Sequence, residues 1–311
     1  MHKTVWRLCI RKVSSPYGFA CGGMVRMTGG NLDLFTAFSR EVTPLLAEYR
    51  ARIQHLAVER KPDRTLITEA DRHVQAVLVD RIREVEPSAR IVAEEGTPDH
   101  GSGMPGRTWV IDPIDGTASF VDPDASEFCS VVAMVDEGVP VACWILAPEL
   151  GPSRSAVEVV LGTGGAVLVN GRECAPPEAR PWIHASATRS SGTEPAPFES
   201  LLHARSVQVK TRTTSQTLDQ VRVCCDLVTV GVEPRFDWFF RRRQKVWDGV
   251  AGMALALRQG LAVVNDAGEP LTPLSEGLLS STDPVLGSAL IARPEDVDAV
   301  VALIRKSPAL P

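Results

Sequence analysis

Apolar residues recur every three or four positions in two early segments of the chain. The first segment covers residues 34–56 and follows Asn31 and Asp33, either of which can cap a helix. The second covers residues 74–85, follows Thr68 and is itself followed by a proline. This spacing predicts two amphipathic helices, the second of which ends before the proline.

Shorter apolar runs bounded by turn residues predict strands. Two strands are expected at residues 90–93 and 108–111, and the Gly- and Pro-rich segment 97–107 between them is expected to be a surface loop. Residues 128–135 and 139–146 flank a Glu-Gly turn and predict a hairpin.

Prolines and glycines gather at residues 147–154 and indicate a junction between two parts of the chain. Beyond it we expect strands at 156–161, 166–169, 182–185, 206–210 and 236–240, and helices at 217–230 and 248–259. Helices and strands interleave without a regular βαβ spacing, which predicts layered α/β (α+β) packing. The expected division is a tail at 1–30, either disordered or an upstream extension, an α+β domain at 31–150 and an α/β domain at 151–311.

Composition narrows the class of protein. The 311 residues are 44% hydrophobic and 23% charged, which is ordinary for a globular protein, and the net charge of −5 argues against a nucleic-acid partner. No run of 18 apolar residues is present, so no membrane span is expected. The seven cysteines form no C-x-x-C pair, which indicates reduced thiols in a cytoplasmic protein. The adjacent Cys224 and Cys225 are interpreted as part of the hydrophobic core.

One short string carries most of the chemistry, Asp112-Pro-Ile-Asp115-Gly-Thr117. It follows the strand predicted at 108–111, and Pro113 is expected to end that strand and to place both aspartates on a tight turn. Mg²⁺ prefers oxygen ligands, so two carboxylates and the intervening Ile114 carbonyl can hold two such ions close together.

Three other motifs accompany this string. Thr68-Glu-Ala-Asp71 and Glu94-Glu-Gly lie upstream, and Trp247-Asp248-Gly-Val-Ala-Gly lies downstream. In this order the four motifs resemble the inositol monophosphatase family of metal-dependent, lithium-sensitive sugar and nucleotide phosphatases. The resemblance covers residues 31 to 290.

The resemblance implies a sugar-phosphatase fold with alternating αβαβα layers and a homodimer. It also implies Mg²⁺-dependent hydrolysis of a small phosphomonoester by a metal-activated water, with two or three Mg²⁺ ions per site. The implied metal ligands are Glu94, Asp112, the Ile114 carbonyl, Asp115 and Asp248.

The same resemblance assigns the catalytic and substrate contacts. Asp71 and Thr117 would orient and deprotonate the attacking water, and Asp71 with Glu94 would hold a weaker third ion through water. The amides of Gly116 and Thr117 at a helix start would bind a phosphate oxygen. Ordinary structural interpretations remain open, since Asp115, Thr117 or Asp248 can cap a helix and Asp71 can be a first-turn acid.

One departure bears on the substrate. Members that process inositol carry an acidic residue seven positions before the Trp-Asp aspartate, where this chain has Arg241 within the segment 241–245. A guanidinium prefers carboxylate or phosphate, so the hypothesis is a doubly anionic substrate, such as 3′-phosphoadenosine 5′-phosphate, NADP or fructose-1,6-bisphosphate. The alternatives are a solvated basic loop at 241–245, histidinol phosphate as substrate, or a catalytically silent relative that binds an anion or a partner protein.

Overall fold

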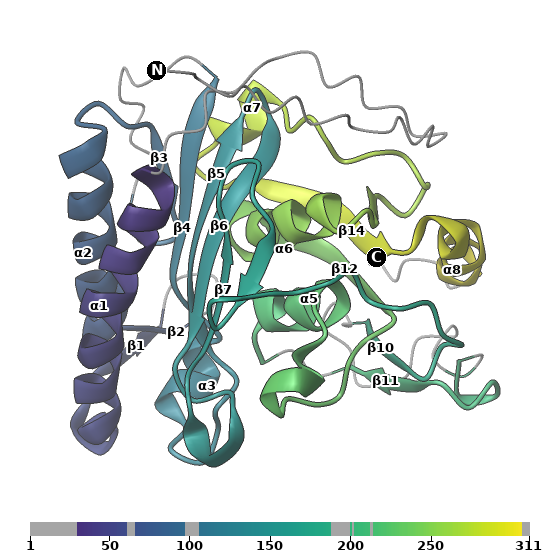
Figure 1. The fold of residues 1–311 in the computed structure, drawn as a ribbon, viewed down its shortest axis with the longest axis horizontal. Coiled ribbons are helices and arrows are strands. Elements are labelled where there is room, and N and C mark those ends of the chain that lie inside the picture. The colour runs from purple at the N-terminus through teal and green to yellow at the C-terminus, as the bar shows by residue number, and fades with distance from the viewer. Residues whose placement is uncertain are drawn as a thin grey trace, which may run out of the picture.

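Helices and sheets alternate in layers through the molecule, which confirms the expected αβαβα architecture (Figure 1). The computed structural model describes residues 30–60, 66–96, 106–187, 200, 202–211 and 214–306. The tail expected at 1–30, apart from its last residue, and most of the loop expected at 97–107 lie outside these residues.

Two long helices begin the described chain and form the first layer. The α-helices are α1 (Gly30–Ala51), α2 (Glu69–Val85), α3 (Thr117–Val121), α5 (Gln216–Cys224), α6 (Val246–Arg258), α7 (Glu276–Leu279) and α8 (Val297–Arg305). Short 3-10 turns are η1 (Ile53–His55), η2 (Pro152–Arg154), η3 (Leu227–Val230) and η4 (Pro294–Asp296). None of the helices in the described part of the chain has the length and hydrophobicity that crossing a bilayer requires.

The larger sheet has seven strands in the order β3-β4-β5-β6-β7-β8-β9, antiparallel except for the parallel pair β3 and β4. Its strands are β3 (Ile91–Ala93), β4 (Arg107–Asp115), β5 (Cys129–Asp136), β6 (Val139–Ala147), β7 (Val157–Leu161), β8 (Val167–Val169) and β9 (Arg172–Glu173). The expected hairpin at 128–146 is therefore confirmed as β5 and β6. The division expected after residue 150 falls inside this sheet, because β7 pairs with β6.

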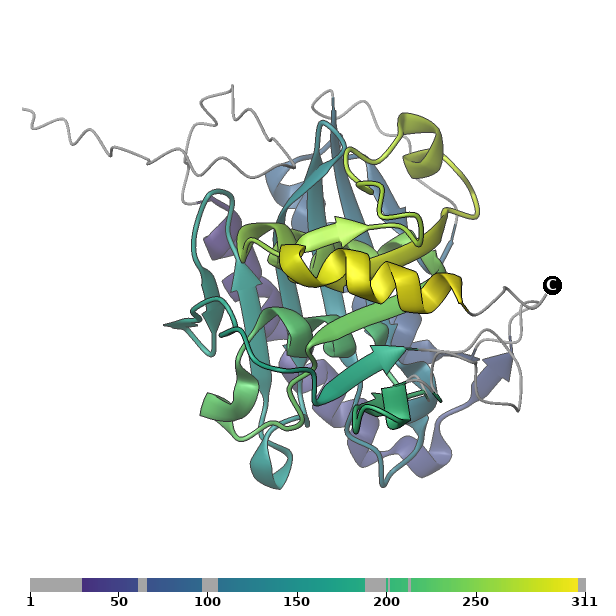
Figure 2. The same cartoon turned by 90° about the vertical axis from the view of Figure 1, so that its right-hand side faces the viewer.

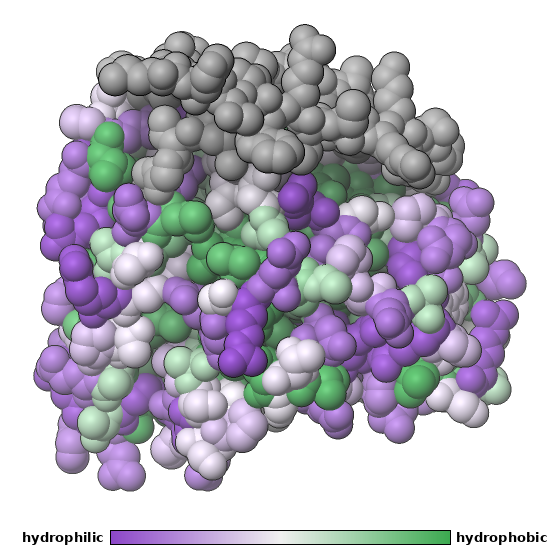
Figure 3. Space-filling model, in the orientation of Figure 1, coloured by the Kyte–Doolittle hydropathy of each residue, from purple (hydrophilic) through white to green (hydrophobic). Residues whose placement is uncertain are grey.

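Both faces of this sheet are buried. Along β5, Val131 and Ala133 face the core shared with α5 and α6, whereas Val132 and Met134 face the core shared with α1 and α2. Because successive side chains of a strand point to opposite faces, a strand with helices on both sides is apolar at nearly every position. The outer surface of the α1–α2 layer carries mainly polar side chains, at the left of Figure 3, as amphipathic helices require.

The smaller sheet has the order β11-β10-β12-β14-β13 and lies on the other side of α5 and α6. Its strands are β10 (His184–Ala187), β11 (Gln208–Lys210), β12 (Trp238–Lys245), β13 (Ala262–Val264) and β14 (Val285–Ala292). Helix α8 covers its outer face and packs on a third apolar core (Figure 2). A separate pair, β1 (Val58–Arg60) and β2 (Leu66–Thr68), leads into α2.

Three expectations about element limits are wrong. Strand β4 continues through Pro113. Its pairing with β5 is interrupted between Asp112 and Asp115, so the missing N–H of Pro113 costs no hydrogen bond between the two strands. The helix expected at 217–230 ends at Cys224 as α5. Residues 241–245, for which a solvated loop was one interpretation, belong to strand β12 and pair with β14.

A buried arginine at the end of α1 fastens the segment that follows α3. The Arg50 side chain is 7% exposed and forms a two-point ion pair with Glu149, at 2.9 Å for each contact. It also donates to the carbonyl oxygens of Phe120 (2.6 Å), Asp122 (3.0 Å) and Ala125 (2.9 Å). Helix α1 thus holds the chain on both sides of residue 122.

An ionic network joins the larger sheet to the smaller one beside α5. Glu127, just before β5, pairs with Lys210 of β11 at 2.8 Å and with Arg222 of α5 at 2.7 Å. Lys210 also contacts Asp219 of α5 at 2.7 Å. Burial raises the pKa of Glu127, but Arg222 and Lys210 outweigh it and bring the pKa to about 2.

The depressed pKa of Glu127 predicts a stability contribution that depends on pH. Because the folded pKa lies below the unfolded one, this contribution is fully present above about pH 4.5 and is lost as the pH falls toward 2. We expect Glu127→Gln to lower the free energy of unfolding by about 2 to 3 kcal/mol at pH 7 and by progressively less below pH 4.5. Denaturant unfolding of both proteins across this range measures the difference.

The control is Glu59→Gln, which removes an exposed ion pair with Arg72. We expect no measurable change for it, since exposed pairs contribute little. A Glu127→Gln effect that stayed constant between pH 7 and pH 3 would contradict the assigned pKa.

Candidate metal centre and active site

The two aspartates of β4 point to the same side because the strand is irregular between them. Residues three apart in a regular strand face opposite sides of the sheet. Here the pairing shifts between Asp112 and Asp115, and Ile114 enters the same apolar core as Ile111 instead of alternating with it. The extra residue of this bulge therefore brings both carboxylates to the face that looks toward α6.

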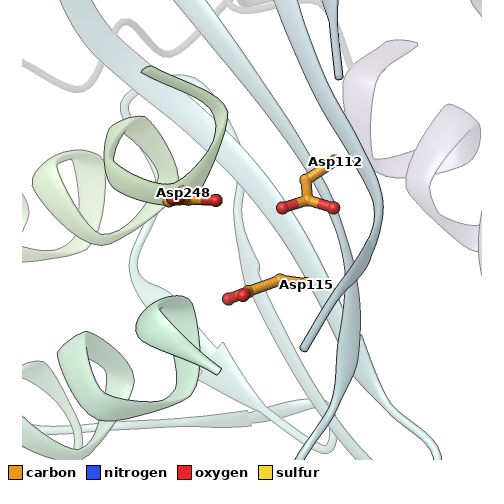
Figure 4. A group of neighbouring side chains, drawn as sticks. All are labelled: Asp112, Asp115 and Asp248. Carbon is orange, nitrogen blue, oxygen red and sulfur yellow. The ribbon is translucent and has the colours of Figure 1, made fainter. Parts of the chain in front are cut away.

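Asp248 completes the group from the first turn of α6. Ligand oxygens of Asp112, Asp115 and Asp248 all lie within 4.8 Å of one another. In Figure 4 the three side chains converge from β4 on one side and α6 on the other. The N-cap position of α6 belongs to Lys245, so Asp248 lies inside the first turn and is not the cap.

Electrostatic repulsion at this point is severe. Burial and the neighbouring carboxylates of Glu94, Asp115 and Asp248 raise the pKa of Asp112 well above its usual value. Burial, Asp115 and Glu94 do the same to the pKa of Asp248. One oxygen of Asp112, Oδ1, is buried without a hydrogen-bond partner among the described residues. Converging carboxylates with a buried unsatisfied oxygen fit a hard divalent cation, which takes oxygen ligands and supplies the missing charge.

The first turn of α5 supplies donors to two of these carboxylates. Asp115 accepts from the Ser215 hydroxyl at 2.7 Å and from the Thr217 amide at 2.7 Å. The Gln216 side chain donates to Asp248. The Ser215 hydroxyl and the amides of Gln216 and Thr217 partly offset the rise that burial causes in the pKa of Asp115.

The sequence analysis did not identify these α5 residues. Ser215 is the N-cap of α5, and its hydroxyl also accepts from Leu218 at 3.1 Å. A serine before a helical segment is a detectable cap signal. The contact with Asp115 joins residues 100 positions apart and has no such local signal.

Glu94 lies beside Asp112, as the order of motifs predicted. It follows β3, and its amide donates to the Ile111 carbonyl at 3.1 Å, so the parallel pairing of β3 and β4 brings it there. Glu95 makes a different contact from Glu94: its amide donates to the Gln75 side chain of α2 at 3.0 Å.

The side chains of Asp71 and Thr117 lie close together, as expected. Asp71 is also an acid in the first turn of a helix, which is the structural role that the sequence left open. Its Oδ2 accepts from the Thr68 amide at 2.7 Å and from the Thr68 hydroxyl at 2.6 Å, which closes a capping box at the start of α2. Its other oxygen, Oδ1, lies 3.4 Å from Thr117 Oγ1. Thr117 Oγ1 in turn lies 3.1 Å from the Ile114 carbonyl oxygen.

Gly116 has a backbone that only glycine tolerates well. Its φ is +88°, and a Cβ there would lie 2.7 Å from the Thr214 carbonyl oxygen and 3.0 Å from that of Glu127. This close approach lets the segment before α5 pass against the start of α3.

Arg241 lies at the edge of the acidic group. It is half-buried on β12, and the pKa of its guanidinium is lowered by burial and raised by Asp248 and Asp115. Reciprocally, Arg241 lowers the pKa of Asp248. The structure thus brings Asp112, Asp115, Asp248 and Glu94 into one acidic group, with Arg241 at its edge and the Asp71–Thr117 contact beside the end of β4.

Comparisons with known proteins bear on the family and the fold of the chain. The inositol monophosphatase family profile matches residues 32–298. The fructose-1,6-bisphosphatase/inositol-1-monophosphatase of Thermotoga maritima is 28% identical over 251 residues, which is 80% of this chain and 90% of the relative. The 3′(2′),5′-bisphosphate nucleotidase CysQ of Shigella flexneri is 26% identical over 77% of this chain and 92% of its own length.

Solved structures share the fold. The crystal structure of an IMPase/NADP phosphatase complexed with Mg²⁺ and phosphate superimposes with a TM-score of 0.70 at 18% identity, covering 90% of this chain and 97% of that one. With the profile matching most of its length and the acidic motifs assembled at one point, the chain belongs to the inositol monophosphatase family and is a phosphoric monoester hydrolase.

Proposed function

We propose that this enzyme hydrolyses a small phosphomonoester in a Mg²⁺-dependent reaction. The observation that carries the proposal is the convergence of Asp112, Asp115 and Asp248, with ligand oxygens within 4.8 Å of one another and one buried Asp112 oxygen left unsatisfied. Relatives named as phosphatases and a fold neighbour crystallised with Mg²⁺ support it.

The proposed metal ligands are Glu94, Asp112, the Ile114 carbonyl, Asp115 and Asp248. When bound there, divalent cations would neutralise the phosphate and make a nearby water more acidic. Two or three ions per site remain the expectation from the sequence.

Asp71 and Thr117 are proposed to position the attacking water and take its proton. The carboxylate of Asp71 is fixed by two bonds from Thr68 to Oδ2, so its other oxygen, Oδ1, is held 3.4 Å from the Thr117 hydroxyl. A water bound to Thr117 Oγ1 can pass a proton toward Asp71 as its oxygen attacks phosphorus. The ester P–O bond then breaks, the leaving oxygen takes a proton from a solvent water to form the alcohol, and Asp71 returns its proton to solvent.

The substrate contacts are proposed from the same surroundings. The amides of Gly116 and Thr117 would bind a phosphate oxygen at the start of α3. Arg241 would bind a second anionic group, because it is a half-buried cation beside the acidic group and stands where inositol-processing members carry an acid. The relatives named as acting on bisphosphates support this doubly anionic substrate, and histidinol phosphate stays an alternative because a histidinol-phosphatase is also among the relatives. The homodimer, the cytoplasmic location and the domain limits stay predictions.

Replacement of the central ligand tests the metal assignment. We expect Asp112→Asn to lower Mg²⁺-dependent phosphate release at least about 100-fold and to abolish the rise in melting temperature that Mg²⁺ gives the unmodified enzyme. The exposed Asp124→Asn is the matched control and should keep both properties. Unchanged turnover in Asp112→Asn would remove this residue from the site.

Loss of the Ser215 hydroxyl tests the role of α5. We expect Ser215→Ala to raise the Mg²⁺ concentration for half-maximal activity by about tenfold while the rate at saturating Mg²⁺ changes little, since a residue that orients a ligand acts mainly on affinity. The control is Ser275→Ala, which removes the same kind of helix cap from α7. If both variants raised the Mg²⁺ concentration for half-maximal activity equally, the loss of a helix cap would explain the change, and the contact of Ser215 with Asp115 would have no role in metal affinity.

A substrate panel tests Arg241. It contains inositol phosphate, histidinol phosphate, 3′-phosphoadenosine 5′-phosphate, NADP and fructose-1,6-bisphosphate. We expect kcat/KM to favour a doubly anionic member, and Arg241→Gln to lower that value by about tenfold or more with little effect on inositol phosphate. The control is Arg243→Gln, an exposed residue on the same strand. A preference for inositol phosphate over every doubly anionic candidate would overturn this assignment.

A further inference from the structure

Three buried glutamines gather around Asp248, between helices α5 and α6. Gln216 and Gln220 belong to α5, and Gln244 lies near the end of β12, just before α6 begins. Their exposed fractions are 7%, 0% and 1%. Burying an amide group is costly unless it is hydrogen-bonded, so each of these side chains is expected to have partners in the fold.

Gln216 and Gln244 form a chain of hydrogen bonds that ends on the Asp248 carboxylate. Gln216 Nε2 donates to Asp248 Oδ2. The opposite end of the same amide, Gln216 Oε1, accepts from Gln244 Nε2 at 3.2 Å. An amide turned the other way would set its oxygen against the carboxylate and its nitrogen against another donor. Gln244 therefore fixes which end of the Gln216 amide faces Asp248.

The backbone carbonyl of Asp248 anchors the other end of this chain. It accepts from Gln244 Nε2 at 3.3 Å, which orients the Gln244 amide. It also accepts from Gln220 Nε2 at 3.0 Å and from the Thr217 hydroxyl at 3.4 Å. Gln220 thus makes the same kind of bond to the backbone as Gln244 does, but it lies outside the chain that reaches the carboxylate.

This arrangement leaves two buried amide oxygens, Gln220 Oε1 and Gln244 Oε1, without a hydrogen-bond partner among the described residues. A buried acceptor without a partner destabilises a fold, and an apolar side chain at either position would avoid that loss. A Cβ on Gly249 of α6 would lie 2.9 Å from Gln244 Oε1. A Cβ on Gly252 would lie 2.6 Å from Gln220 Cβ, so glycines leave the space that both amides occupy. Packing alone therefore does not account for these glutamines.

We propose that Gln244 and Gln216 form an amide relay that positions the Asp248 carboxylate for a divalent cation, a role that depends on the proposed metal-dependent function. The Gln216 amide restrains the orientation of the carboxylate and offsets part of its repulsion from Asp112 and Asp115. Without the relay, the Asp248 side chain would be free to turn away from these neighbours before a cation binds. The relay therefore acts on cation affinity and not on the attack of water.

The test measures binding of Mn²⁺ alone to the full chain, without substrate, from the electron paramagnetic resonance signal of the free ion. Mn²⁺ takes oxygen ligands as Mg²⁺ does, and its binding is measured independently of turnover. Methionine has nearly the length of glutamine and lacks its donors, and at residue 216 it keeps the backbone amide that lies 3.3 Å from Asp115. We expect Gln216→Met and Gln244→Met each to raise the Kd for Mn²⁺ by about tenfold.

Two further variants separate a relay from independent contributions. Because Gln244 acts on the carboxylate through Gln216, adding Gln244→Met to Gln216→Met should raise the Kd by no more than about twofold further. The matched control is Gln220→Met, which removes an equally buried amide and its bond to the Asp248 backbone. Its Kd should stay within about twofold of that of the parent. Denaturant unfolding without metal checks that each variant is folded.

Different results would overturn the relay and the proposed function. If the parent binds Mn²⁺ and Gln216→Met binds it equally well, the relay is wrong, whether or not the more deeply buried Gln244→Met folds. A loss in Gln220→Met as large as that in Gln244→Met, or a double variant whose loss is the product of the two single losses, would also overturn the relay. A parent that binds no Mn²⁺ would contradict the proposed metal-dependent function, and the relay with it.

Discussion

Mutual repulsion of carboxylates is the constraint on which the rest of the structure depends. Asp112, Asp115, Asp248 and Glu94 come from three separate elements and meet with little solvent to screen them. Folding must bring these carboxylates together at an electrostatic cost, which a bound cation would offset. Three features fix this arrangement. The bulge in β4 positions Asp112 and Asp115, the first turn of α6 positions Asp248, and the pairing of β3 with β4 positions Glu94.

Helix α5 connects the regions that surround this constraint. Its first turn donates to Asp115 and Asp248, its middle carries the Asp219 and Arg222 members of the ionic network, and its last residue, Cys224, lies in the core beneath the larger sheet. All nine of its residues are buried, including four with polar or charged side chains in its first five positions. Most of these polar side chains meet a partner contributed by another element, whereas Gln220 Oε1 and Arg222 Nε are buried without one among the described residues.

The sequence predicted the layers and the main carboxylates because both depend on local pattern. Period 3.6 identified α1 and α2, and the Asp-Pro-Ile-Asp-Gly-Thr string located the site before any contact was known. The bulge in β4 could not be predicted, because a proline that follows an apolar run is equally consistent with the end of the strand. The contact of Ser215 with Asp115 could not be predicted for another reason. The helix-cap signal of Ser215 is local, but its hydrogen bond to Asp115 joins residues 100 positions apart in the sequence. The position of Arg241 could be read from its spacing to Asp248, whereas its strand conformation depends on pairing with β14.

The contacts of Arg50 have a consequence for local opening of the segment between α3 and β5. Four backbone carbonyls and Glu149 share one buried guanidinium, and the ring of Phe128 lies 5.1 Å from it. Departure of the segment between α3 and β5 would leave donors of this buried guanidinium without acceptors, with only Glu149 still paired to it. The amide hydrogens of this segment should therefore exchange with solvent only when α1 also comes away, so that the segment and the first helix form one cooperative unit of unfolding.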